Sequence, residues 1–291
     1  MFDNVKFNFP FMKYRKLWIG ISILFVFLSF GMLFSKGLNL SVDFTGGLVF
    51  QVKFAKSAEV ADVRASLAKI GQGQATIQKY DNGNFLIRLQ ESSGNLQKQV
   101  NDLLKADFEG AQILQVDKVG PVVGGELRRQ AFIALAIALL GILIYMAFRF
   151  RFRFGVAAVL ALFHDTTIML GIYSLTGKEI SITFIAAVLT IVGYSLNDTI
   201  VVMDRIRENW KSVRNDGVLN VINTSINETL TRTINTALTT LLPVIAMLLF
   251  GGEVIANFAF AFLVGIIFGT YSSIYVAGGI VAEWYLHSPK A

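Results

Sequence analysis

The residue that most needs a chemical explanation is Asp198, a carboxylate inside the otherwise apolar segment Ile182–Met203. An ionised Asp at the centre of a membrane helix costs roughly 2.5–3.5 kcal/mol on insertion scales. Acids kept at such positions relay protons or ions by default, and the simpler interpretation is an Asp that only joins two helices through hydrogen bonds. Its polar neighbours, which could support either role, are Tyr194, Ser195, Asn197 and Thr199.

A second acid, Asp165, lies near the middle of another apolar segment, directly after His164. Two intramembrane carboxylates on neighbouring helices suit groups that bind and release protons. His164 is the weaker candidate, because a single His among apolar residues is more often a hydrogen-bonded packing residue. The sequence therefore predicts a proton relay that includes Asp198 and Asp165, with no catalytic residue, metal site or cofactor.

Arg232 comes four residues after Glu228, and the sequence leaves two roles open for it. One is an ordinary i,i+4 ion pair with Glu228, worth a few tenths of a kcal/mol. The other is a pair with Asp198 that forms in one state and separates in another, so that the acid is ionised when close and can protonate when apart. Beyond Arg232, a face of threonines runs toward Pro243, whose missing N–H leaves a backbone carbonyl without its helical partner.

The elements that must hold these residues are membrane helices. Of the 291 residues, 54% are hydrophobic and 16% are charged, which is too apolar for a soluble protein of this length. At about 1.5 Å per residue, six segments are long enough to cross a bilayer or to form the core of a span. The predicted spans are Leu17–Phe34, Ala131–Phe148, Phe154–Leu175, Ile182–Met203, a span with its core at Thr236–Phe250, and one within Ala256–Leu286.

Small residues recur every four positions in the last span, at Ala261, Gly265, Gly269, Ser273 and Ala277. Such a ladder lets a neighbouring helix approach closely, through dispersion and weak Cα–H···O contacts. We expect Gly265, Gly269 and Ser273 to serve helix packing.

Residues 36–128 have the mixed composition of a soluble domain. The turn Asp81-Asn82-Gly83-Asn84 is a strong hairpin signal, because Asn and Gly accept the positive φ that such turns require. With helical spacing on either side of this hairpin, the predicted order β-α-β-β-α-β is that of a ferredoxin-like domain. The predicted elements are Leu48–Phe54, Ala58–Ile70, Ala75–Tyr80, Phe85–Gln90, Leu96–Phe108 and Ile113–Val119. Without His or Cys, this domain is expected to be a binding or mechanical module.

Basic residues beside the spans predict the orientation in the membrane. Their positions follow the positive-inside rule, which accounts for the net charge of +6 without nucleic acid as a partner. Both termini are expected in the cytoplasm and residues 36–128 outside it. The chain then divides into 1–35, a lead and the first span; 36–128; and 129–291, a five-helix membrane region with a cytoplasmic segment at 204–235. Within that segment, Ser212–Ile234 is expected to form an amphipathic helix or two along the inner face. The basic residues are Lys13, Arg15, Lys16, Arg149, Arg151, Arg153, Arg205, Arg207, Lys211 and Arg214.

Ordered blocks of residues along almost the whole chain resemble the SecD/SecF family of bacterial protein-export membrane proteins, within the resistance–nodulation–division superfamily. The most specific is Gly193–Thr199, GYSLNDT, followed by Asp204–Asn209, DRIREN. The others are VDFTGG at Val42–Gly47, VGPVVG at Val119–Gly124, FHD at Phe163–Asp165 and GTYSSI at Gly269–Ile274.

The resemblance implies a SecD partner that contributes six more helices and a larger external domain, in the bacterial inner membrane. It implies that the pair uses the proton gradient to draw exported, unfolded polypeptide out of the SecYEG channel after SecA has pushed it in. By position, Asp198 corresponds to the family's proton-relay Asp and Arg232 to its functional Arg.

Three questions stay open at this point. Na⁺ could replace H⁺ as the coupling ion. The chain could instead be a structural scaffold that stabilises SecD and SecYEG without its own relay. A small-molecule exporter of the same superfamily is a third function, and it would need a substrate pocket in the external domain.

Overall fold

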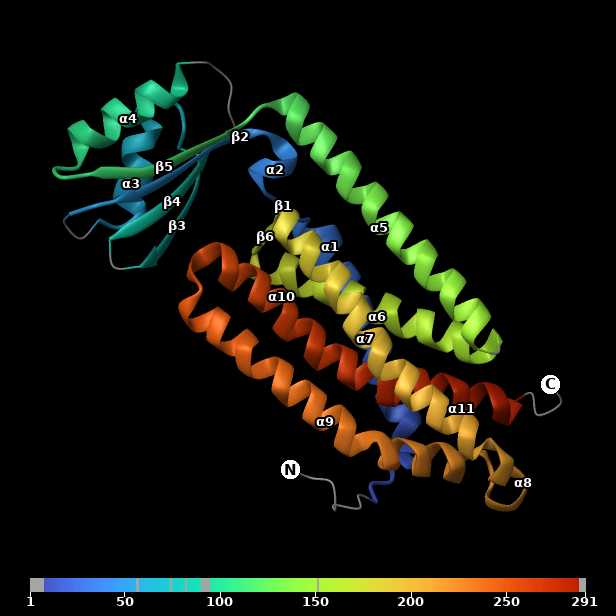
Figure 1. Ribbon diagram of the computed structural model, residues 1–291. Helices are drawn as coiled ribbons and strands as arrows, with labels where there is room; N and C mark the ends of the chain where they lie inside the picture. Colours follow the sequence, from blue (N-terminus) through green and yellow to red (C-terminus); the bar gives the residue numbers. More distant parts are fainter. Residues whose placement is uncertain are drawn as a thin grey trace. The chain divides into compact units, whose positions relative to one another are not determined.

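The computed structural model describes residues 8–55, 58–73, 75–81, 83–89, 95–150 and 152–287 (Figure 1). The first seven residues of the predicted lead, the basic residue Arg151 and the turn residue Asn82 lie outside these ranges. The chain forms two compact units. One is Leu40–Ala134, and the other consists of the residues up to Asn39 together with those from Leu135 onward.

In the described part of the chain, six helices are long and apolar enough to span a membrane, which confirms the predicted number. The chain is therefore a multi-pass membrane protein. In the last helix, α10 continues through a π-helical segment into α11, and we call Ser272–Ala277 the π segment. The helices are α1 (Arg15–Lys36), α5 (Pro121–Arg149), α6 (Phe152–Thr176), α7 (Ile182–Asn209), α9 (Val218–Phe250), and α10 (Gly252–Tyr271) with the π segment and α11 (Gly278–His287).

The six spans differ in how far the rest of the chain covers them. In α6, α7 and the last helix, 61%, 50% and 61% of the most apolar stretch is buried, against 11%, 6% and 11% in α1, α5 and α9. The high burial of α6 comes in part from its close contact with α1. Gly171 of α6 lies so near α1 that a Cβ there would be 2.3 Å from Ser29 Oγ. The inner helices are thus the ones that can enclose a polar site.

The segment Ser212–Ile234, predicted to form an amphipathic helix or two, is mostly the first part of α9. A short helix, α8 (Val213–Asp216), precedes Gly217, and α9 then runs unbroken to Phe250 with Pro243 inside it. The apolar face of this segment is covered by protein, and its position along the inner face of the membrane stays a prediction. Val221, Ile222 and Ile226 are buried, and α9 packs on α7, α11 and the 3-10 helix Phe11–Tyr14.

We call Leu40–Ala134, which includes most of the predicted soluble domain, the soluble unit, and the other unit the membrane unit. The soluble unit contains a four-stranded antiparallel sheet in the order β3-β4-β2-β5. On β2, alternate residues Leu48, Phe50 and Val52 enter one apolar core with residues of two helices. The predicted order of strands and helices is present, with bounds within two residues, whereas the ferredoxin-like assignment stays a prediction. The elements are β2 (Gly47–Lys53), α3 (Val60–Ala68), β3 (Thr76–Asp81), β4 (Asn84–Leu89), α4 (Leu96–Asp107) and β5 (Gln112–Val119); the short elements elsewhere are β1 (Asn39–Leu40), α2 (Val42–Thr45) and β6 (Glu179–Ile180).

Two glycine-containing blocks meet where the soluble unit begins and ends. Gly46 and Gly47 follow α2 with φ of 75° and 143°, conformations that suit glycine. A Cβ on Gly47 would lie 2.3 Å from the carbonyl oxygen of Leu89, and one on Gly124 would lie 3.0 Å from the Gly46 nitrogen. The first turns of α5 therefore pack directly against the chain that enters β2.

Candidate functional site

Asp165, on α6, is 3% exposed, and polar side chains from three helices surround its carboxylate. Ser195 of α7 donates a hydrogen bond to Oδ2 at 2.7 Å, and Ser272 of the π segment donates to the same oxygen at 2.8 Å. His164 Nδ1 lies 2.9 Å from Oδ1. The carboxylate thus ties α6, α7 and the last helix together, which is the role of an acid that joins helices.

Small residues of α10 allow this arrangement. A Cβ on Gly265 would lie 2.4 Å from Ile191, and one on Gly269 would lie 3.0 Å from the Cβ of Ser195. One turn later, Ser273 Oγ lies 2.8 Å from Thr199 Oγ1 and donates to the Gly269 carbonyl at 2.9 Å. The ladder residues Gly265, Gly269 and Ser273 therefore line the seam between α7 and the last helix.

Asp198 lies on α7 one turn after Ser195 and is also 3% exposed. In contrast to Asp165, its Oδ2 is buried without a hydrogen-bond partner among the described residues. Asp165 and Asp198 are joined by no shared hydrogen bond in the described part of the chain. A buried carboxylate without a fixed partner is free to take a proton, a cation or a water molecule.

Arg232, on α9, is exposed in this chain, and it is close enough for its charge to act on Asp198. No ion pair within 4.0 Å joins the two side chains in the described residues. The ordinary pair between Arg232 and Glu228 is wrong, because Glu228 accepts hydrogen bonds from Arg205 Nε and Asn209 Nδ2, each at 2.7 Å. The pair between Arg232 and Asp198 that forms in one state and separates in another stays a prediction.

The remaining predicted residues, Tyr194, Thr199 and Asn197, have different surroundings. Tyr194 is half-buried near Asp198 and Thr240, and Thr199 donates to the Ser195 carbonyl at 3.1 Å. Asn197 is exposed. Among the described residues, no group of three or more His, Cys, Asp or Glu side chains could hold a metal ion.

Sequence reasoning missed Ser272 and the polar contacts beyond His164. The four-residue ladder indicated Ser273 but not Ser272, which turns toward Asp165 where the helix is π-helical. The ring of Tyr271 lies 5.9 Å from that of His164, and its hydroxyl donates to the Trp18 carbonyl at 2.8 Å and accepts from Ser22 at 2.7 Å. Tyr271 and Ser272 both belong to the block GTYSSI. The π segment begins inside this block, and π-helical turns are frequent at functional sites.

Fold and site together define a multi-pass membrane protein that has a small sheet domain between its first two spans and two acids buried among its inner helices. The family model described as "Protein export membrane protein SecD/SecF, C-terminal" matches residues 99–287, and the model "SecD/SecF GG Motif" matches residues 31–58. The chain belongs to the SecD/SecF family.

Curated relatives agree with this assignment. The chain is 43% identical to the protein translocase subunit SecF of Desulfurispirillum indicum, over 94% of this chain and 91% of the relative. It is 41% identical to SecF of Haemophilus influenzae, over 97% and 88% of the two chains. A relative of a different length is the protein translocase subunit SecDF of Thermus thermophilus, which is 45% identical over 95% of this chain but only 38% of its own length.

Among solved structures, the chain resembles the crystal structure of SecDF from Thermus thermophilus, described as a translocon-associated membrane protein. The TM-score is 0.89 at 44% identity, and the match covers 97% of this chain. This chain spans 39% of that SecDF chain.

Proposed function

We propose that this chain is a subunit of a protein translocase and that Asp198 is the acid that couples it to the proton gradient. The observation that carries the proposal is the contrast at the site. Asp198 is a buried carboxylate without a fixed partner, and the charge of Arg232 acts on it from the neighbouring α9. The names of the SecF relatives support the translocase context.

We propose SecD as the direct partner. The support is the Thermus thermophilus relative, in which a region similar to this chain is part of a longer protein named SecDF. The exported, unfolded polypeptide and the SecYEG channel follow as the other partners, and no catalytic activity is proposed.

We place the chain in the bacterial inner membrane with both termini in the cytoplasm and residues 36–128 outside. Contacts that basic residues make with acidic and aromatic side chains support this orientation. Arg149 pairs with Asp204 at 2.5 Å, Arg15 pairs with Glu283 at 2.8 Å, and the Arg153 guanidinium lies 4.5 Å from the ring centroid of Tyr285. The basic ends of α1, α5 and α6 thus gather on α7 and α11, as the positive-inside rule expects of one cytoplasmic end.

The proposed mechanism has two steps. A proton that reaches Asp198 removes its attraction to Arg232, and α7 and α9 then pack differently. Each elementary charge that crosses 100 mV supplies about 2.3 kcal/mol, enough to bias a two-state element substantially. Ser195 and Thr199 hold α7 to α6 and to the last helix through Asp165 and Ser273, so that motion is expected on the side of α9.

The test is pulse-chase export of a secreted protein in cells with wild type, Asp198→Asn or Arg232→Ala at matched membrane levels, with and without an uncoupler. We expect both variants to behave like uncoupled wild type while still assembling with SecD. Normal, uncoupler-sensitive export by Asp198→Asn would replace the proposal with the scaffold function. The same assay in vesicles with an imposed Na⁺ or H⁺ gradient identifies the coupling ion.

A further inference from the structure

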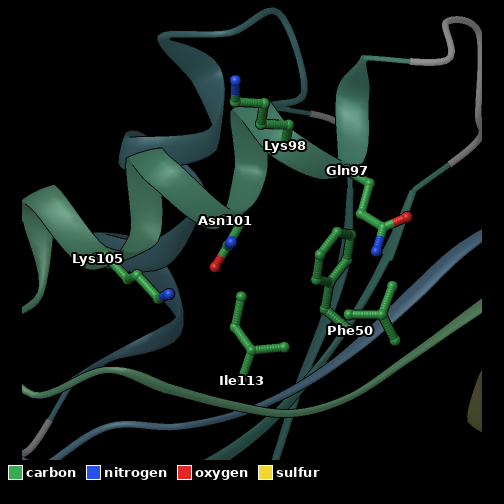
Figure 2. Close-up of a pocket in the computed structure, with 7 residues that line it drawn as sticks. Phe50, Gln97, Lys98, Asn101, Lys105 and Ile113 are labelled. Atoms are coloured by element: carbon green, nitrogen blue, oxygen red, sulfur yellow. The ribbon is translucent and has the colours of Figure 1, made fainter.

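An open crevice lies in the soluble unit between α4 and the sheet, with a volume of about 480 Å³. In Figure 2, α4 passes over one side of it and the strands form the other. Phe50 of β2 lies at its base without exposure, and Ile113 and Val116 of β5 give it an apolar wall. Side chains of α4 complete the lining: Gln97, Lys98, Asn101 and Lys105.

The polar lining of the crevice has no partners within the described part of the chain. None of the four α4 side chains makes a side-chain hydrogen bond or ion pair with a described residue, and no acidic residue lines the crevice. Figure 2 shows Asn101 directed toward Ile113 and Gln97 directed toward Phe50. Two cations and two amides beside an apolar wall complement a ligand that carries both a carboxylate and apolar side chains.

The crevice lies beside an edge strand. In the order β3-β4-β2-β5, β5 has a strand neighbour on one side only, so its outer backbone groups pair with no strand of the described ranges. The register passes from Gln51↔Gln115 to Val52↔Ile113, which leaves Leu114 as a bulge, 53% exposed. A bulge limits regular pairing to the Gln115–Val119 part of the edge and so protects against indiscriminate strand addition.

We propose that the edge of β5 and the α4 crevice together bind an extended polypeptide segment in which acidic residues alternate with, or lie beside, apolar ones. The segment adds as a strand along Gln115–Val119. Because successive side chains of a strand point to opposite faces, every second residue enters the crevice. Apolar residues there contact Ile113 and Val116, and a carboxylate reaches Lys105 or Lys98. The inference rests on the proposed export role in one respect: the natural occupant is then the exported chain.

The first test measures binding of a fluorescent peptide to the full chain in nanodiscs of zwitterionic lipid. The peptide has Thr at every second position, and Leu and Glu take turns at the positions between. Empty nanodiscs give the background. Lys105→Glu is expected to weaken binding about fivefold or more, because an attraction becomes a repulsion. The matched control is Lys53→Glu, an equal charge change on β2 at a position that alternates to the opposite face of the sheet. Equal affinities of the two variants would overturn the proposal.

Charge reversal of the peptide makes the test independent of folding defects. With Lys in place of Glu, the peptide is expected to bind Lys105→Glu more tightly than wild type, which a misfolded variant would not do. Loss of binding of both peptides to Lys105→Glu, with wild-type unfolding behaviour, would count against direct contact.

A second test addresses the edge strand. Two peptides are N-methylated at alternate residues, one at the odd positions and one at the even positions. Only every second residue of an added strand directs its backbone groups to β5, so one peptide is expected to lose binding and the other to keep most of it. Equal behaviour of the two peptides would exclude strand addition. These measurements need neither a proton gradient nor SecD, so their failure leaves the export result for Asp198→Asn unaffected.

Discussion

The two buried acids of the membrane unit lie close to one helix, α7, yet their surroundings differ. Asp165 has a donor or ring nitrogen at each carboxylate oxygen, supplied by Ser195, Ser272 and His164. Asp198 has the same small exposure and a buried oxygen without a partner. Equal burial therefore does not imply an equal role. Asp165 has the geometry of a fixed joint, and Asp198 that of a group that must change its state.

The difference follows from what packs on each face of α7. On the side of Asp165, Gly265 and Gly269 bring α10 close enough for serine hydroxyls to reach the acid. On the side of Asp198, α9 contributes Arg232 and a row of threonines. The hydroxyls of Thr236 and Thr240 bond to carbonyls of α9 itself, at 2.8 Å, rather than to the acid.

The largest expected effect comes from separating α10 from α7. A Leu at Gly265 would overlap Ile191, since even a Cβ would lie 2.4 Å from it. We expect Gly265→Leu to destabilise the membrane unit by about 3 kcal/mol, and to remove most of the folded protein from the membrane. Denaturant unfolding in detergent and the amount in membranes measure this.

The control for that variant is Gly193→Leu. Gly193 lies on α7, the helix against which Gly265 of α10 packs, but a Cβ there would meet nothing within 4 Å. It is expected to change stability by less than about 0.5 kcal/mol. Equal losses in both variants would mean that the close packing of α7 and α10 is not what positions Asp165.

The second prediction compares the acids directly. Asp165→Ala leaves the buried Ser195 hydroxyl without its acceptor, leaves Ser272 only the Gly269 carbonyl at 3.1 Å, and is expected to destabilise by about 2–3 kcal/mol. Asp198→Ala removes a group with no fixed partner and is expected to change stability by less than about 0.5 kcal/mol. Thermal and denaturant unfolding of the purified chain decide between them.

A conservative variant distinguishes lost hydrogen bonds from a cavity. Asp165→Asn keeps an oxygen that accepts from both serines, so it should recover a large part of the stability lost in Asp165→Ala. If Asp198→Ala proved as destabilising as Asp165→Ala, Asp198 would be a structural joint as well, and the contrast would fail.

The sequence predicted the helices and the two acids because apolar length and a charge inside it are local properties. All six spans could be predicted in this way, and side-chain patterns with the turn at Asp81–Asn84 predicted the succession of strands and helices in residues 36–128. The partners of Asp165 could not, since they depend on a π-helical turn that rotates Ser272 inward. The length of α9 was also missed, because an amphipathic pattern is the same whether lipid headgroups or a 3-10 helix and α7 cover the apolar face.

The third prediction concerns Glu228, whose partner differed from the local expectation. Its carboxylate pairs with Arg205 at 2.7 Å, and both side chains are about two-fifths exposed. A double-mutant cycle on Glu228→Ala and Arg205→Ala should give a coupling of about 0.5–1 kcal/mol. The same cycle with Arg232→Ala should give a coupling near zero. A larger coupling to Arg232 would return that residue to a structural role and weaken its link to Asp198.

The smallest effect extends the contrast to an acid outside the membrane. Asp107 of α4 accepts hydrogen bonds from Lys69 Nζ and Ser66 Oγ, each at 2.6 Å. The Lys69 bond, and then the Ser66 bond, lower the pKa of Asp107 below its ordinary value of 3.8. Asp107 has as many donors as Oδ2 of Asp165, but solvent screens them, and Asp107→Asn is expected to destabilise by only about 0.5 kcal/mol at neutral pH.

Because the pKa of Asp107 is lowered in the folded state, its stabilisation is fully present above 3.8 and is lost as the pH falls through the folded value. The stability difference between wild type and Asp107→Asn should therefore vanish in acid, as urea unfolding at a series of pH values would show. The control is Asp102→Asn, at an exposed acid of the same helix without a partner among the described residues, and it is expected to change stability by less than about 0.5 kcal/mol at neutral pH. If Asp107→Asn matched Asp165→Ala in its effect, the number of donors alone would decide the role of an acid, and burial would not.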